Sequence, residues 1–301
     1  MQNRKRYALV GAGGRSVMFL HPLAKKYSDI AELVALCDPS ETRMRAHLKT
    51  LKDDFNLQDA VSCYTSQDFE KMLADTKPDT VFITTIDSLH ADYILRTLDA
   101  GCNAIVEKPL AINAEQCRAI QKAAQKSDKN VRVTFNYRWS PGVTSVWKAL
   151  HDGKIGNIKH VNFEYLLDTT HGADYFRRWH SNLANSGGLL VHKSTHHFDL
   201  INWWLDSIPE TIFALGDLNF YGKKNALARG DEAFTKYDRY TGNDTGNDPF
   251  RLDLLADENA KKIYYDAEKD SGYIRDQNVF RDGIDIYDTM SVNARYRNNC
   301  T

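Results

Sequence analysis

The sequence predicts an α/β protein with two domains: a doubly wound parallel sheet, then an α+β domain with a mostly antiparallel sheet. An apolar run over residues 7–10 passes directly into the glycine-rich turn at 11–16, Gly-Ala-Gly-Gly-Arg-Ser. Short apolar segments then alternate with helical patterns up to residue 135, which is typical of a parallel sheet covered on both faces. We therefore predict a Rossmann domain over 1–136 and an α+β domain over 137–301.

Composition and charge narrow the class of protein. The 301 residues are 42% hydrophobic and 26% charged, with a net charge of −1, which gives no sign of a nucleic-acid partner. No apolar run reaches membrane-spanning length, and no signal peptide is apparent. The five cysteines are scattered without a C-x-x-C pair, which predicts reduced thiols, no cysteine-based zinc site and a cytoplasmic location.

Each strand of the first domain is predicted as a short buried run. The expected strands cover 7–10, 32–37, 61–64, 79–85, 103–107 and 130–135, and the helices between them cover 17–27, 40–55, 66–73, 90–100 and a long segment after residue 113. Ser66 and Asn113 are typical N-caps, and Gly101 is typical of a helix C-terminus.

The glycine-rich turn is the first candidate binding site. Gly11 can take a backbone conformation that a side chain forbids, and Gly13 and Gly14 let the main chain approach a ligand closely. The helix that begins after Arg15 and Ser16 presents free N–H groups, which suit a pyrophosphate. Because Ser16 stands at the third small position of this dinucleotide fingerprint, an ordinary strand-to-helix turn is the alternative.

Asp38 is the second candidate, because it ends the second expected strand. An acidic side chain there can accept hydrogen bonds from the ribose hydroxyls of an adenosine and repels a 2′-phosphate, which favours NAD over NADP. Arg43 and Arg45 lie close by in the sequence and could pair with such a phosphate. The alternative for Asp38 is a plain N-cap of the next helix.

Further motifs give a more specific signal than the turn. They are Thr84-Thr85-Ile86-Asp87-Ser88-Leu89-His90, Ala100-Gly101, Glu107-Lys108-Pro109, Asn136-Tyr137-Arg138 with Pro141, and Gly187-Gly188 followed by residues 192–199. In this order they resemble the Gfo/Idh/MocA family of glucose–fructose oxidoreductase and inositol dehydrogenase relatives, over about residues 6–205. One departure is Ile86, which stands where the family has proline.

The resemblance implies an NAD(P)-dependent oxidoreductase that transfers a hydride between a sugar or polyol hydroxyl carbon and the nicotinamide. It favours NAD over NADP as the cofactor. It also implies a small-molecule substrate, with no nucleic-acid or membrane partner, and it allows a homo-oligomer. Beside the glycine turn, the candidate cofactor residues are Asp38, Arg43, Thr85, Ile86, Asp87, His90, Glu107, Lys108 and Asn136. The candidate substrate residues are Tyr137, Arg138, Trp179 and Lys193.

Lys108 is the first candidate catalytic residue, because it follows a strand at the cofactor edge of the sheet. Its ammonium can hydrogen-bond a substrate hydroxyl and stabilise charge on the oxygen while hydride leaves the carbon. Glu107 can hold that ammonium or a cofactor ribose, and in the family the peptide before Pro109 is often cis. The alternative is a surface lysine–glutamate pair.

The segment 192–199 supplies the other candidate catalytic residues. His192, His196, Asp199 and Trp203 are expected on one helix face by their i, i+3 and i+4 spacing. His196 matches the family's general acid/base, and His192 stands where the family has aspartate, so His192 would orient His196 or titrate itself. The i, i+4 spacing of His192 and His196 also allows a metal site, which we consider less favoured than the acid/base role. The remaining alternative is that these histidines are hydrogen-bonded side chains of the core.

The histidine in place of aspartate leaves a second function open, an NAD-assisted sugar lyase or glycosidase without net redox change. The early end of the chain leaves a third open, a non-catalytic dinucleotide-binding protein.

The second domain is predicted from weaker patterns. We expect a helix at 137–154, strands at 157–167, 213–221 and 284–297, a polar loop at 169–185, and a turn at Asn298-Asn299. Residues 222–282 are expected to form a polar insertion that decorates the second sheet. Because the family would continue with further strands, we expect a truncated second domain with an exposed sheet edge.

Overall fold

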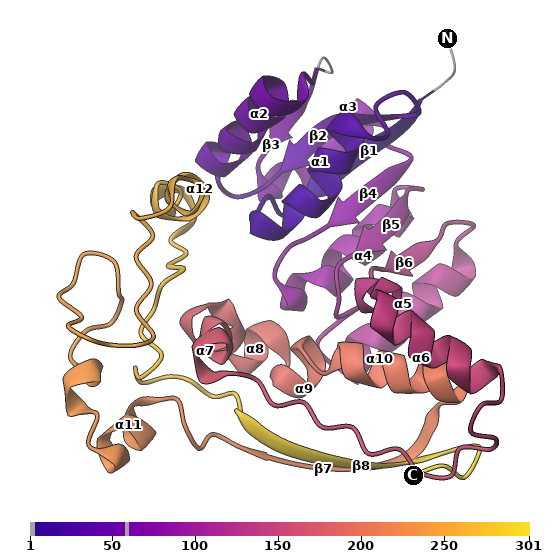
Figure 1. Cartoon of the computed structure of the whole chain (residues 1–301). Helices are drawn as coiled ribbons and strands as arrows, with labels where there is room; N and C mark the ends of the chain where they lie inside the picture. The colour runs from indigo at the N-terminus through magenta and orange to yellow at the C-terminus, as the bar shows by residue number, and fades with distance from the viewer. Residues whose placement is uncertain (1–3, 58–59) are drawn as a thin grey trace. The chain divides into compact units, whose positions relative to one another are not determined.

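The computed structural model describes residues 4–57 and 60–301 and divides into two compact units (Figure 1). The first unit comprises the chain up to Val133 together with residues 239–244 and 251–277. The second comprises residues 134–238, 245–250 and 278–301. Among the described residues, no helix is both long and apolar enough to cross a lipid bilayer.

The first unit is built on a six-stranded sheet in the order β3-β2-β1-β4-β5-β6, and every neighbouring pair is parallel. Its strands are β1 (Lys5–Val10), β2 (Ala31–Cys37), β3 (Ser62–Tyr64), β4 (Thr80–Ile83), β5 (Asn103–Val106) and β6 (Val131–Val133). This is the strand order of the doubly wound dinucleotide-binding fold, so the predicted fold class of the first half is confirmed.

Helices cover both faces of this sheet (Figure 1). They are α1 (Val17–Lys25), α2 (Glu41–Phe55), α3 (Phe69–Thr76), α4 (His90–Asp99) and α5 (Ala114–Lys126). Because side chains alternate along a strand, Leu9 of β1 packs in one core with α1 and α2. Ala8 and Val10 pack in the other core, with α3, α4 and α5. Two buried faces explain the near-continuous apolar strands of the sequence.

Most of the predicted helix boundaries in this unit are confirmed. The side chain of Asn113 accepts a hydrogen bond from the Gln116 N–H and caps α5, and Gly101 follows α4 with φ +73°. Ser66 does not cap α3, because it begins a short 3-10 turn (Ser66–Asp68) that precedes the helix. The peptide between Lys108 and Pro109 is cis.

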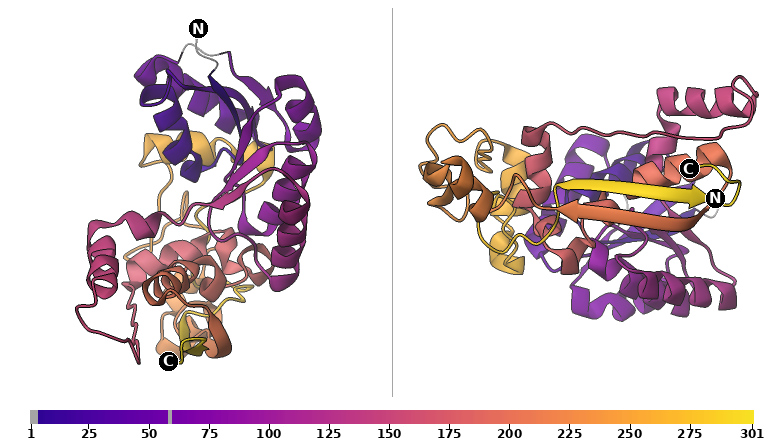
Figure 2. Two further views of the ribbon diagram at one scale, coloured as in Figure 1. Left: turned by 90° about the vertical axis from the view of Figure 1, so that its right-hand side faces the viewer. Right: turned by 90° about the horizontal axis from the view of Figure 1, so that it is seen from below.

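The second unit combines short helices with a two-stranded sheet. Its helices are α6 (Pro141–His151), α7 (Thr169–Arg177), α8 (Leu183–Ser186), α9 (Leu189–His192), α10 (Thr195–Leu205) and α11 (Lys223–Arg229). The strands β7 (Pro209–Asp217) and β8 (Thr289–Tyr296) pair antiparallel and run side by side (Figure 2, right). The predicted antiparallel sheet is thereby confirmed, with β7 beginning earlier than expected.

Three expectations for the second half are wrong. Residues 157–167 form no strand. Two backbone hydrogen bonds join this segment to Thr301, from Val161 N–H to Thr301 O and from Thr301 N–H to Lys159 O. Residues 169–185 are largely helical, because Asp168 caps α7 by accepting from the N–H groups of Thr170 and His171. The insertion does not decorate the second sheet throughout, since residues 251–277 pack with the first unit.

Candidate functional site

The glycine turn leaves β1 at the carboxyl end of the sheet, close against the end of β4. Gly11 has φ +89°, and a Cβ built on it would lie 2.6 Å from backbone atoms of Thr84 and Thr85, so this position accepts only glycine. A Cβ on Gly13 would meet nothing within 4 Å, so the space beside the turn is open. The turn therefore has a tight backbone at Gly11 and, at Gly13, the open approach that a pyrophosphate needs.

His47 supports the turn from α2, and sequence reasoning missed it. The buried ring donates from Nε2 to the carbonyl oxygen of Ala12 at 2.9 Å. Burial lowers the pKa of His47, so the imidazole is held in its neutral form. No local pattern connects His47 with the turn, because their contact depends on how α2 packs.

Asp38 ends β2 beside the turn, and its carboxylate is fully engaged. Oδ2 accepts from the Ala12 N–H at 2.7 Å, while Oδ1 accepts from the Ser40 N–H and from Arg43 Nη1, each at 2.8 Å. The N-cap of α2 is Ser40, whose hydroxyl accepts from the Arg43 N–H. The alternative of Asp38 as a plain N-cap is thus wrong, and its carboxylate instead links the turn to α2.

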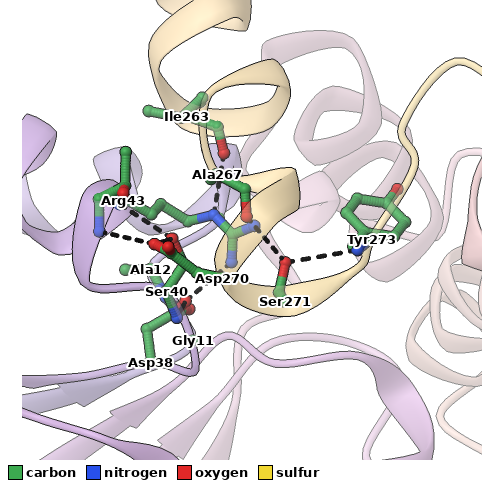
Figure 3. Close-up of polar contacts among 12 residues, drawn as sticks. Gly11, Ala12, Asp38, Ser40, Arg43, Ile263, Ala267, Asp270, Ser271 and Tyr273 are labelled. Atoms are coloured by element: carbon green, nitrogen blue, oxygen red, sulfur yellow. Dashed lines mark hydrogen bonds and ion pairs between the residues drawn. The ribbon is translucent and has the colours of Figure 1, made fainter.

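Arg43 is buried, and its guanidinium group binds both Asp38 and the carbonyl oxygen of Ile263 (Figure 3). Its Nη1 pairs with Asp38, and its Nε donates to the carbonyl oxygen of Ile263 at 2.9 Å. Arg45, the other arginine near this strand, pairs with Glu41 on the surface of α2, with Nε 3.0 Å from Oε1. Both guanidinium groups are therefore engaged within the chain.

The loops after β4 and β5 are held together by His90. Its ring is fully buried, with Nδ1 at 2.7 Å from Pro109 O and Nε2 at 3.3 Å from Thr85 O. Burial lowers the pKa of His90, and the two carbonyl oxygens oppose that effect. His90 thus fixes the turn of the Glu107-Lys108-Pro109 motif against the loop that carries Thr85, Ile86 and Asp87.

Glu107 joins that motif to the glycine turn. Its buried carboxylate lies 3.1 Å from Arg15 Nε. Lys108 follows directly, just beyond the carboxyl end of β5, and is half-buried. The structure therefore brings most of the sequence-predicted cofactor residues to the carboxyl edge of one sheet. Asn136 lies in the second unit, in the 3-10 turn Asn136–Trp139.

In the second unit, α10 presents His196 to aromatic neighbours. The buried imidazole lies edge-on to Tyr137, with ring centroids 5.6 Å apart, and to Phe135 at 6.1 Å. One helical turn on, Asp199 binds Arg138, with Arg138 Nε 2.7 Å from Oδ2. Arg138 also lines a shallow pocket of about 470 Å³.

His192 does not share that helix face, so the prediction of a common face is wrong for this residue. It ends α9, and the chain turns at Lys193 and Ser194 before α10 begins. The ring of His192 lies 4.0 Å from that of His180 and contacts Tyr175 and Trp179. Sequence reasoning did not assign His180 or Tyr175 to the site, although the stretch 175–180, with three aromatic residues and one histidine, was the available signal.

The remaining predicted substrate residues lie around the same helices. Trp179 stacks on His180 with ring centroids 3.7 Å apart, and Lys193 Nζ lies 5.2 Å from the ring centre of Tyr165. Over residues 4–57 and 60–301, no three or more histidine, cysteine, aspartate or glutamate side chains are arranged to hold a metal ion.

Comparison with known proteins identifies the family. The profile of its NAD-binding Rossmann fold matches residues 5–135, and the profile of its C-terminal α/β domain matches residues 148–247. The chain belongs to the Gfo/Idh/MocA oxidoreductase family. The predicted recognition of this family from the motifs is therefore confirmed.

Individual relatives agree with this assignment. The chain is 38% identical to the protein YteT of Bacillus subtilis over 205 residues, 68% of this chain and 47% of the relative. It is 32% identical to the D-apiose dehydrogenase of Paraburkholderia graminis over 173 residues, 57% of this chain and 43% of the relative. The chain thus spans about half the length of these curated relatives.

Two solved structures share the fold. The myo-inositol 2-dehydrogenase of Lactobacillus plantarum matches with a TM-score of 0.61 and 22% identity, over 76% of this chain and 63% of that one. The WlbA dehydrogenase of Bordetella pertussis, in complex with NADH and UDP-GlcNAcA, matches with a TM-score of 0.57 and 24% identity, over 71% and 62%. At this level of identity the likeness concerns the fold.

Proposed function

We propose that this chain binds NAD and a sugar or polyol, and takes part in oxidising a hydroxyl carbon of that substrate. The observation that carries the proposal is the gathering of the glycine turn, Asp38 and the Glu107-Lys108-Pro109 motif at one edge of a Rossmann sheet. The family assignment and the dehydrogenase names of its relatives support it.

The residues present fit a dinucleotide. Gly13 leaves open space beside the turn for a pyrophosphate. Asp38 lies at the end of β2, where the fold places the adenosine ribose, and its carboxylate is already bonded to Ala12, Ser40 and Arg43. Arg43 is held by the buried carboxylate of Asp38, so its guanidinium group is not placed to receive a 2′-phosphate. These contacts support NAD over NADP.

A bound nicotinamide would supply the hydride acceptor for this chemistry. In the proposal, the ammonium of Lys108 hydrogen-bonds the reacting hydroxyl oxygen and stabilises its developing charge, while His196 takes the hydroxyl proton. His90 and the Arg15–Glu107 pair act as positioning groups for Lys108. His192, which contacts His180, is proposed to relay a proton or to orient His196. The proposed substrate contacts are Tyr137, Trp179, Lys193 and Arg138, whose guanidinium group is held by Asp199.

The test is NADH formation with a panel of sugars and polyols, using Lys108→Ala and the exposed-helix control Lys122→Ala. We expect Lys108→Ala to lower kcat by about a hundredfold or more while NADH still binds, because one charge-stabilising donor is lost. Lys122→Ala should keep wild-type turnover. NADPH should bind at least about tenfold more weakly than NADH. Wild-type turnover in Lys108→Ala would overturn the mechanism.

The His192–His180 contact favours a second candidate, a lyase or glycosidase that uses NAD without net redox change. His192 stands where the family has aspartate, and its contact with a second histidine, His180, would give proton transfer a different pH dependence. Product analysis decides between the two, since cleaved glycoside without NADH supports the second and stoichiometric NADH excludes it.

A further inference from the structure

A segment from the second half of the chain packs on the dinucleotide-binding unit. It contains α12 (Glu258–Ala260), a π-helical turn (Lys261–Tyr265) and α13 (Glu268–Ser271), and we call residues 258–273 the strap. The strap belongs to the first unit, and its π-helical turn packs against α2. π-Helical turns are rare and occur frequently at functional sites.

One strap side chain reaches the glycine turn itself. The hydroxyl oxygen of Tyr264 accepts a hydrogen bond from the Gly14 N–H at 3.1 Å. A Cβ on Gly14 would lie 2.7 Å from this oxygen, so the glycine is what admits the tyrosine. In the dinucleotide fingerprint, the N–H groups of this turn are the donors that face the pyrophosphate. Tyr264 therefore lies beside the expected phosphate position.

The geometry leaves room for both the tyrosine and a phosphate. A hydroxyl that accepts from Gly14 keeps its own proton, which it can donate to a second acceptor. Next to it, Gly13 has open space, with nothing within 4 Å of its Cβ position. A pyrophosphate oxygen in that space would meet the turn and the Tyr264 hydroxyl together.

The strap is anchored at the adenosine end of the same site (Figure 3). Asp270 Oδ2 accepts from the Thr42 N–H at 3.0 Å and from the Ser40 hydroxyl at 2.8 Å, at the start of α2. These bonds lower the pKa of Asp270, the largest effect being that of the Thr42 N–H. Arg43 adds a bond to the Ile263 carbonyl oxygen, and thereby links the strap to Asp38.

A further ion-pair network holds α13 of the strap. Arg239 pairs with Glu268 at 2.8 Å and with the buried carboxylate of Asp276 at 2.6 Å. The strap is thus held on both sides of Tyr264 in the sequence, at Ile263 and at Glu268 and Asp270, which lets the tyrosine hydroxyl act as a defined hydrogen-bonding group.

We propose that the strap is a built-in wall of the dinucleotide site, and that Tyr264 donates its hydroxyl proton to the cofactor pyrophosphate. The proposal rests on the proposed function, because it requires that this chain binds NAD. It adds to the first half of the chain a cofactor residue supplied from the second half.

The test compares Tyr264→Phe with the neighbouring control Tyr265→Phe, whose exposed ring faces Arg239. Calorimetry would measure the Kd for NADH, ADP-ribose and adenosine. Loss of a hydrogen bond to a charged group should raise the Kd of Tyr264→Phe for NADH and ADP-ribose about tenfold or more. Adenosine, which has no phosphate, should bind both variants as it binds the wild type, and Tyr265→Phe should bind all three ligands normally.

The outcomes separate the two proposals. Wild-type protein that fails to bind NADH would overturn the proposed function and, with it, the strap's role. Tight NADH binding by the wild type, with an unchanged Kd in Tyr264→Phe, would overturn only the role of Tyr264. A lower Kd in Tyr264→Phe would also overturn it, because the tyrosine would then compete with the phosphate for Gly14. Matching far-UV circular dichroism spectra would verify that Tyr264→Phe is folded.

Discussion

Replacing Asp38 with asparagine tests the centre of the dinucleotide-binding unit. The substitution keeps the size of the side chain and removes its charge. In the native protein this carboxylate is 2% exposed and accepts three hydrogen bonds, from Ala12, Ser40 and Arg43. Asparagine has one acceptor oxygen, so its NH₂ group must face at least one of these donors.

The expected cost follows from these contacts. Removing one partner of a buried ion pair costs about 3–5 kcal/mol, because the remaining charge is left in a poorly solvated place. A buried backbone N–H without an acceptor costs about 1–3 kcal/mol, and the two effects overlap because they involve one side chain. We therefore expect Asp38→Asn to lower the free energy of unfolding by about 3–5 kcal/mol.

Urea unfolding followed by far-UV circular dichroism measures this loss. The surface pair Lys49–Asp53 supplies the control, since Asp53→Asn should cost less than about 1 kcal/mol. The double variant Asp38→Asn/Arg43→Met should recover at least about 1 kcal/mol, because no uncompensated charge remains. A loss below about 1 kcal/mol in Asp38→Asn alone would refute the reasoning that Asp38 is the charge partner of Arg43.

Two further predictions concern single positions. Burial, with Lys193 nearby, lowers the pKa of His197 to about 4 from 6.5, so the unfolded chain binds more protons between these values. The free energy of unfolding should therefore fall by up to about 3 kcal/mol from pH 6.5 to pH 4. Urea unfolding at several pH values should show a smaller fall in His197→Phe. The same pH dependence in this variant as in the wild type would contradict the prediction. Gly11→Ala should destabilise by about 2–5 kcal/mol through strain and backbone overlap, whereas Gly13→Ala should cost under about 1 kcal/mol in the same assay; equal losses would exclude the overlap.

The parts of the site that sequence predicted are those with local causes. A buried strand must be apolar, so the run before Gly11 and the segment before Lys108 are both recognisable from their own residues. The tight turn at Gly11 and the cap at Asn113 likewise depend on a few adjacent positions. Parallel strands then bring these local features to one edge, because all their carboxyl ends point the same way.

The parts that sequence missed depend on distant contacts. Tyr264 meets Gly14 across 250 residues, and Asp270 meets Ser40 across 230. A polar insertion gives no periodic signal of where it will pack, so its place on α2 could not be predicted. His192 was assigned to the face of His196 by spacing alone, but the turn at 193–194 separates the two helices.

By itself, the sequence determined the doubly wound sheet, the glycine turn, the acidic end of β2 and the family. Each of these follows from the neighbours that a residue has along the chain. Only the tertiary structure decided that Arg43 is enclosed by Asp38 and the strap, that His192 packs against His180, and that residues 251–277 pack with the first unit. Those contacts depend on which surfaces pack against each other in the folded chain. No local sequence pattern predicts that packing for residues that lie far apart in the sequence.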